Sequence, residues 1–223
     1  MGSIEFRESI DDTSGTNTYT FTGVDFGAAA SDRYIIIGII NRKLGGATSI
    51  TGVTIGGETA TVLAQISGLT GNVSHSGLAI ALVPTGATGT VVVNMAHSML
   101  RCTIGVWRAT GLSSPTPHDT LTNNSNNPSG TLDVVAGCAV GAGGTGSGGA
   151  VSVDWAGLTQ DFSNSPAGAM RTTGAHEEFV SPESGRSIGI TFSSNNSSVL
   201  SVASWAYDTA GVARRPLNFG GGL

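Results

Sequence analysis

The sequence predicts an all-β protein, an antiparallel two-sheet β-sandwich of jelly-roll character, formed either as one compact body or from two related halves. Two observations lead to this fold class. Glycine accounts for 34 of the 223 residues and charged residues for only 11 %, whereas glycine costs about 1 kcal/mol at each helical position. Short stretches with apolar residues at every second position recur between Gly-, Pro- and Asn-containing turns, as in antiparallel sandwiches.

Two tryptophan-containing stretches show this period most clearly. Residues 100–111 alternate between apolar and polar side chains and include Trp107, and residues 198–211 repeat the alternation around Trp205. A strand with this period buries one of its faces. We therefore expect both indole rings to pack at the edge of the sandwich, and the recurrence indicates two related halves, residues 18–111 and 116–211.

The individual strands follow from the same pattern taken in chain order. The run at 34–40 is continuous and apolar, which is typical of a buried strand, and Gly56 and Gly57 predict a hairpin turn. The whole pattern predicts about 12 to 14 strands. They are expected at 18–22, 34–40, 50–55, 59–64, 78–83, 90–95 and 100–107 in the first half, and at 132–140, 151–153, 168–172, 186–192 and 198–205 in the second.

The segments outside these strands lack a clear period. Residues 1–17 are interpreted as an N-terminal arm, residues 18–211 as the sandwich and residues 212–223 as a C-terminal tail. The glycine-rich run at 140–149 is interpreted as a mobile hairpin loop in the second half. Apolar residues of the two terminal segments are candidate contacts to a partner: Phe6, Ile10, Leu217 and Phe219.

Charge and hydropathy disfavour two classes of partner. The net charge is −5, the pI is about 5.2, and the ten basic residues are mostly scattered, whereas binding to nucleic acid needs clustered positive charge. The longest apolar run, 34–40, is far below the roughly 20 residues that cross a bilayer. We therefore expect neither a nucleic acid nor a membrane as partner, and the N-terminus shows no signal-peptide pattern.

Cysteine and histidine chemistry is sparse. Cys102 and Cys138 are too few for a disulfide framework or a thiolate metal site, and both lie in apolar patterns, so we expect buried free thiols and no cofactor. His118 and Asp119 are the most suggestive acid–base pair, but neighbours on a strand point to opposite faces. Without a Gly-x-Ser-x-Gly motif to supply a nucleophile, we expect no enzymatic activity.

Two residues remain as candidates for binding a ligand. Trp155 lies at an expected strand end, where its ring could stack on a sugar. His176 precedes Glu177 and Glu178, and on a strand His176 and Glu178 would share a face that could support a cation. Packing of Trp155 and an exposed polar edge around His176 are the alternative interpretations.

Several motifs resemble a known family. The segments at 50–57, 83–93, 101–107 and 155–159 are similar to those of a β-rich family of virion structural proteins found in tailed bacteriophages and their prophages. The resemblance spans roughly residues 18–207, and its motifs are structural. It implies a capsid decoration, head-fibre or tail-appendage protein.

The resemblance also carries expectations about partners and location. The chain would be made in the bacterial cytoplasm and reside in the virion, where it would contact other virion proteins and its own copies. The family contributes no catalytic or cofactor-binding residue. The alternative function is a carbohydrate-binding adhesin or receptor-binding module, in which Trp155 and His176 would contact a surface glycan.

Overall fold

The computed structural model describes residues 2–68, 72–147 and 150–208. Except for one turn of 3₁₀ helix, η1 (Pro166–Gly168), its regular elements are strands. The first half contains β1 (Ser3–Asp12), β2 (Thr16–Asp25), β3 (Tyr34–Leu44), β4 (Ile50–Ile55), β5 (Glu58–Thr59), β6 (Thr61–Ser67), β7 (Asn72–Leu82), β8 (Thr88–Met99) and β9 (Arg101–Thr110). The second half contains β10 (Asp119–Asn123), β11 (Ser129–Val134), β12 (Gly137–Thr145), β13 (Val153–Ala156), β14 (Thr159–Asn164), β15 (Arg171–Phe179), β16 (Glu183–Phe192) and β17 (Val199–Ala206).

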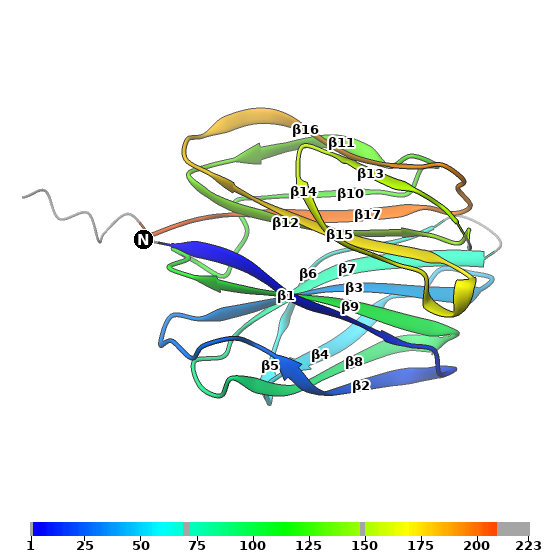
Figure 1. Ribbon diagram of the computed structural model, residues 1–223, viewed down its shortest axis with the longest axis horizontal. Helices are drawn as coiled ribbons and strands as arrows, with labels where there is room; N and C mark the ends of the chain where they lie inside the picture. The colour runs from blue at the N-terminus through cyan, green and yellow to red at the C-terminus, as the bar shows by residue number, and fades with distance from the viewer. Residues whose placement is uncertain (1, 69–71, 148–149, 209–223) are drawn as a thin grey trace, which may run out of the picture.

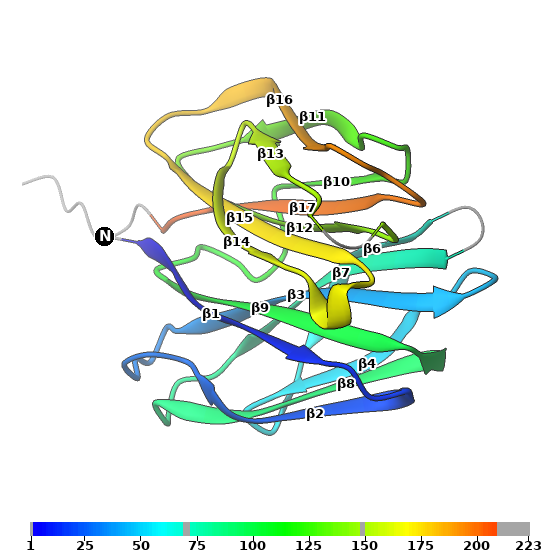
Figure 2. The same ribbon diagram turned by 45° about the vertical axis from the view of Figure 1, so that its right-hand side comes forward.

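These strands form four antiparallel sheets stacked as four layers (Figures 1 and 2). From bottom to top in Figure 1 they are outer sheet 1 (β2-β8-β4-β5), inner sheet 1 (β1-β9-β3-β7-β6), inner sheet 2 (β10-β17-β12-β15-β14) and outer sheet 2 (β11-β16-β13). The predicted all-β antiparallel sandwich is confirmed. The chain forms two such sandwiches, one on the other, and the jelly-roll character of each stays a prediction.

The two sandwiches repeat one strand order. Inner sheet 1 has the order β1-β9-β3-β7-β6, and inner sheet 2 has the order β10-β17-β12-β15-β14. In both sheets the first strand of the half pairs with its last strand, and the last strand pairs with the third. The outer sheets also correspond, except that β5 has no counterpart. Each half of the sequence therefore occupies one sandwich, and residues 111–118 connect them. The strands correspond as β1 to β10, β2 to β11, β3 to β12, β4 to β13, β6 to β14, β7 to β15, β8 to β16 and β9 to β17.

The expectation that residues 1–17 form an N-terminal arm is wrong. Residues 3–12 form β1, which pairs with β9 along its whole length. A bulge between Phe6 and Glu8 reverses the faces of the strand, so Ile4 points toward the second half whereas Ile10 packs in the first sandwich. The bulge and the charged residues typical of an edge strand obscure the alternation in the sequence.

The expected loop at 140–149 is also wrong over much of its length, because β12 continues to Thr145. This strand lies in the middle of inner sheet 2 and is buried throughout. A Cβ atom on Gly141 would lie 2.8 Å from the ring of Trp155, and one on Gly144 would lie 2.7 Å from Cγ2 of Ile40. These glycines allow close approach of layers on both faces of the strand.

The core consists of three clusters, one inside each sandwich and one between them. We call the layer between the two inner sheets the seam. Trp107 and Trp205 are both fully buried there, which confirms that they are packing residues but places them in the seam instead of at a sandwich edge. Period-two alternation shows that one face of a strand is buried but not which layer covers it.

Trp107 is closely surrounded by both halves. Its ring centroid is 5.7 Å from that of Phe6 and 6.1 Å from that of Phe162, which belongs to the second half. A Cβ atom on Gly105 or on Gly174 would lie 2.7 Å from Cη2 of the indole. The glycines of both inner sheets thus make room for one large ring that joins the two sandwiches.

Replacing Trp107 with alanine should lower the free energy of unfolding by about 3–5 kcal/mol, because the large cavity can close only partly. Urea denaturation followed by circular dichroism measures this change. Val180→Ala is the control, since that side chain is 93 % exposed and should alter stability little. A Trp107→Ala protein as stable as the parent would contradict the role of the indole in the seam.

Candidate functional site

A hydrogen-bonded group of three side chains lies at the seam. The Nε1 of Trp107 donates to Oδ2 of Asp161 at 2.8 Å, and Nδ1 of His176 lies 2.8 Å from both carboxylate oxygens of Asp161. The Asp161 side chain is only 8 % exposed. One buried carboxylate therefore ties a tryptophan of the first half to a histidine of the second.

The fold places Asp161 in the seam through a β-bulge. The pairing of β14 with β15 shifts register between Gln160 and Phe162, which permits two consecutive residues, Asp161 and Phe162, to reach the same layer. Phe162 packs in the seam cluster beside Trp107. The sequence places His176 near acidic residues, but the contact with Asp161 depends on the bulge.

The surroundings of His176 favour its charged form. Burial lowers the pKa of His176, but the hydrogen bond with Asp161 and the charges of Asp161, Glu177 and Glu178 outweigh burial, so that the pKa is raised overall. The imidazole therefore holds its proton toward Asp161. Within this group the ion pair connects strands and carries no nucleophile.

A second contact ties β1 to the second half. Glu178 accepts hydrogen bonds at Oε1 from the backbone N–H of Ile4 and from the hydroxyl of Tyr207, both at 2.8 Å. Cys138 is opposite Glu178 on the neighbouring strand. Burial is the main cause that raises the pKa of this thiol to about 12, which disfavours the reactive thiolate at neutral pH.

Trp155 and His176, the two ligand candidates, do not form one site. The Nε1 of Trp155 donates to Oγ1 of Thr173 at 2.9 Å, and its half-buried ring packs against the core of the second sandwich. Thr173 and His176 are three residues apart on β15, so their side chains point to opposite faces. Trp155 lies on the outer side of inner sheet 2 and His176 on the seam side.

The candidate partner contacts Phe6 and Ile10 pack within the chain. The ring of Phe6 stacks on Phe162 with centroids 5.7 Å apart, and Ile10 packs against the core of the first sandwich. Both side chains are half-buried, and these contacts account for their apolar character without a partner. Leu217 and Phe219 lie outside the described residues.

Other groups with potential chemistry are buried. Cys102 and Cys138 are free and buried, as predicted. His75 is fully buried, and desolvation lowers its pKa to about 4.

The guanidinium of Arg33 is also buried, and it donates to five backbone carbonyls: those of Phe26, Gly27, Val83, Thr85 and Gly86. Arg33 thereby joins two loops at one end of the first sandwich.

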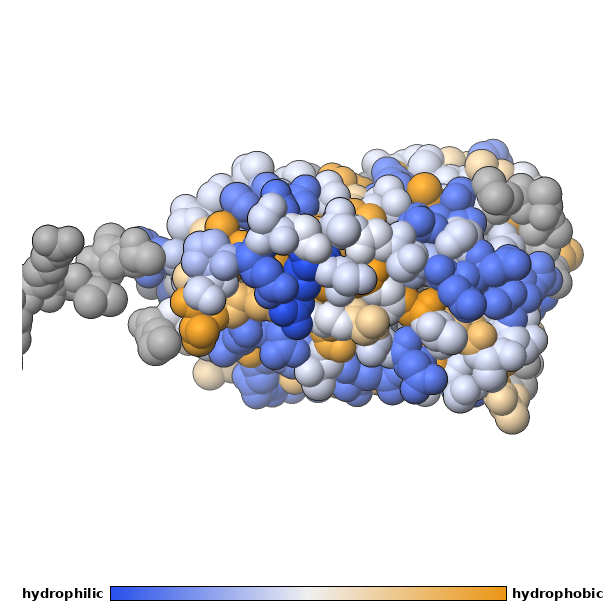
Figure 3. Space-filling view, turned by 90° about the horizontal axis from the view of Figure 1, so that it is seen from above, coloured by the Kyte–Doolittle hydropathy of each residue, from blue (hydrophilic) through white to orange (hydrophobic). Residues whose placement is uncertain are grey.

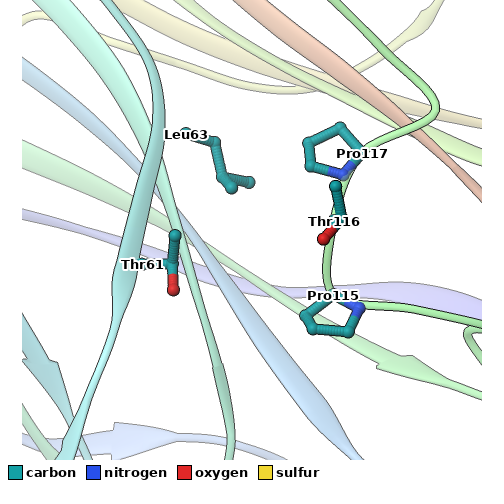
Figure 4. A pocket seen from close by; sticks show the side chains of 5 residues that line it. All are labelled: Thr61, Leu63, Pro115, Thr116 and Pro117. Carbon is teal, nitrogen blue, oxygen red and sulfur yellow. The ribbon is translucent and has the colours of Figure 1, made fainter.

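A small open groove lies where β6 meets the connection between the halves (Figure 4). It has a volume of about 140 Å³ and is lined by Thr61, Leu63, Pro115, Thr116 and Pro117. None of these side chains titrates. The Nε1 of Trp205 donates to the carbonyl of Pro115 at 3.0 Å, so one lining residue of the groove is hydrogen-bonded to a side chain of the seam.

Over residues 2–68, 72–147 and 150–208, no group of three His, Cys, Asp or Glu side chains is placed to hold a metal ion. The same residues include no helix of the length and hydropathy needed to span a membrane. Comparisons with family models, curated proteins and solved structures gave no match.

The outer face of outer sheet 1 is the most distinctive exposed surface. Tyr19 and Phe21 on β2 point into the core, so the threonines that alternate with them point to solvent. Thr20 and Thr54 flank Val92 on either side in one cross-strand row. We call this surface the threonine face; its residues, none of them charged, are Thr18, Thr20, Thr22, Gly52, Thr54, Thr59, Thr90, Val92 and Asn94.

The corresponding face of outer sheet 2 differs because it carries exposed acidic residues, Asp133 and Asp154. Figure 3, which looks down on this side, shows pale and blue residues with orange ones scattered among them. The threonine face was not identified from the sequence. Its signal was the run Thr18-x-Thr20-x-Thr22, which predicts a strand but does not show that β8 and β4 continue the uncharged surface.

Stability should fall as the pH rises above about 6.5, the ordinary pKa of histidine. The pKa of His176 is raised in the folded state, so the ion pair with Asp161 contributes its full stabilisation below that pH. The contribution is lost as the pH rises through the raised pKa. The free energy of unfolding, measured by urea denaturation at pH values between about 6.5 and 8, below the ordinary pKa of a cysteine thiol, tests this slope.

His176→Gln should abolish the slope, and His97→Gln, at an exposed position, should retain it. His75 titrates in the opposite sense but below this window, because its folded pKa is about 4. An unchanged slope in His176→Gln would show that another group is responsible.

Proposed function

We propose that this chain is a non-enzymatic structural component of a tailed-phage particle that acts through protein–protein contacts. Its location would be the virion, and its partners would be other virion proteins and its own copies. The observation that carries the proposal is the threonine face, an uncharged sheet surface made of exposed and half-buried residues. The resemblance of the motifs to virion structural proteins supports the same function.

The composition of the threonine face fits a protein interface. Interface cores are depleted in Lys, Glu and Asp compared with the rest of a protein surface. Thr18 Oγ1 donates to Oδ1 of Asn94 at 2.9 Å, and Thr51 Oγ1 donates to the carbonyl of Asn94 at 3.1 Å, so polar groups here are held in a fixed arrangement. A rigid, uncharged surface loses little side-chain entropy when it meets a partner.

The stacked architecture supports this use of the surface. The threonine face belongs to the sheet farthest from the second sandwich, and the layers behind it are joined by the buried seam. A partner bound there would contact a firmly supported sheet. Repeated copies on a symmetric particle would also favour contacts between identical subunits.

Charge placed on the threonine face should prevent assembly without unfolding the chain. In a Thr20→Lys, Thr54→Lys double variant, two positive charges flank Val92 on the outer surface, where burial in an interface would cost several kcal/mol. We expect this variant to be absent from purified phage particles that are assembled with it in place of the parent chain, as measured by quantitative mass spectrometry.

Thr131→Lys provides the matched control, because Thr131 is exposed on the strand of outer sheet 2 that corresponds to β2. Both variants should keep the parental circular dichroism spectrum, and the control should be incorporated normally. Absence of the parent chain from purified particles would overturn the virion assignment. Normal incorporation of the double variant would overturn the role of the threonine face.

A further inference from the structure

One end of the seam contains a concentration of buried polar atoms without hydrogen-bond partners. We call it the arginine end and define it by Arg42, Ser74, Arg101, Ser165 and Thr172. The atoms concerned are the Nε atoms of both arginines and the three side-chain hydroxyl oxygens. A buried polar group without a partner is destabilising because it has lost its hydrogen bonds to water, so this concentration calls for a group that satisfies these atoms.

Three of these residues form a row across inner sheet 1. Arg42 on β3 is directly opposite Arg101 on β9 and directly opposite Ser74 on β7. Opposed residues on neighbouring antiparallel strands have Cβ atoms about 4.5–5.5 Å apart. Ile40, two residues before Arg42, packs in the seam cluster, so the row lies on the face that meets the second half.

Contacts with the second half confirm that the side chains of this row lie on the face of inner sheet 1 that meets the seam. Arg101 Nη1 donates to the carbonyl of Pro166 in η1 at 2.7 Å, and η1 lies beside the start of β9 in both ribbon views (Figures 1 and 2). Ser76, two residues after Ser74, has its Oγ 2.8 Å from Oγ of Ser201 across the seam. Ser74 therefore faces the second sandwich and is itself fully buried.

The second half contributes two hydroxyl groups to the same end. Thr172 is fully buried and opposite Gly144, the glycine of β12 that approaches Ile40. Ser165 directly precedes Pro166, the acceptor of the Arg101 hydrogen bond. The hydroxyl groups of Ser165 and Thr172 and the guanidinium groups of Arg42 and Arg101 thus belong to the same end of the seam.

The charges at this end are not balanced by carboxylates. In the part of the chain that the structure describes, neither Arg42 nor Arg101 has an ion pair. The acidic residues at this end of β1 have other partners, since Asp11 accepts from Thr103 and Asn164 and Asp12 accepts from Ser14. Burial, and then the charge of Arg101, lower the pKa of the Arg42 guanidinium.

We propose that the arginine end is a binding site for a tetrahedral oxyanion of the phosphate class. Guanidinium groups bind such anions through paired N–H donors, and the free Nε atoms of Arg42 and Arg101 supply them beside the hydroxyl of Ser74. A bound dianion would neutralise two opposed positive charges and would join the first half to Ser165 and Thr172 of the second. Water could satisfy the hydroxyl groups but would leave the two charges uncompensated.

Thermal unfolding of the full chain in inorganic phosphate, against sodium chloride and sodium acetate at equal ionic strength, tests this site. Phosphate should raise Tm progressively with concentration, because a ligand that binds only the folded state stabilises it, while acetate and chloride should not. Titration calorimetry with phosphate should give one site per chain. Arg42→Gln and Arg101→Gln should each weaken phosphate binding by about tenfold or more.

Lys43→Gln is the matched control: it removes one positive charge from the same strand, at the next position, whose side chain points to the opposite face. This variant should bind phosphate like the parent. Because the readout is the response to phosphate, any change that the arginine substitutions cause in phosphate-free buffer does not affect the comparison. Equal Tm values in phosphate and chloride, an equal response to acetate, or unchanged binding by Arg42→Gln would each overturn the proposal.

Discussion

The packing of the two inner sheets against each other is the constraint on which the rest of this structure depends. Each inner sheet is covered on both faces, so its central strands cannot alternate between apolar and polar residues. The middle strands of the two inner sheets, β3 and β12, meet this requirement differently. β3 is rich in isoleucine, whereas β12 consists mostly of small residues from Gly137 to Thr145. Bulky side chains from one half fill the space left by glycines of the other, as where Ile40 approaches Gly144. The two halves thus share one topology and have complementary seam surfaces.

This double coverage explains which parts of the fold were predictable from the sequence. Strands with one exposed face, such as β2, were predicted because their period survives. The second part of β12, from residue 140 onward, was predicted as a loop because glycine is common in loops, and nothing in the sequence shows that close layers on both sides require glycine here. The strand expected at 132–140 was wrong for a similar reason, because this range spans the end of β11 and the start of β12. The true counterpart of β3 begins at Gly137, and short apolar runs fit several registers equally well.

The polar groups of the seam were less predictable than its apolar ones. His176 stood out because acidic residues neighbour it in the sequence, but its partner Asp161 reaches it through a bulge that no sequence pattern announces. Arg42 and Arg101 are far apart in the chain and become neighbours through the register of β3 and β9. Pairwise contacts of this kind are properties of strand pairing, whereas the alternation of one strand carries information only about its own two faces.

The two outer sheets have no covering layer in the described part of the chain, and their outer faces differ in charge. A monomer in solution would be expected to keep charge on both, yet the threonine face has none and its counterpart carries Asp133 and Asp154. The stack separates the two surfaces by two buried sheets, so one can meet a neighbour while the other stays hydrated. This difference in charge between the two outer faces fits the proposed function, in which one face would bind a neighbouring subunit and the other would stay exposed to solvent. In the proposed function the seam would serve as the rigid link between an attached and an exposed surface, because Trp107, Asp161 and His176 form hydrogen bonds between and within the sandwiches.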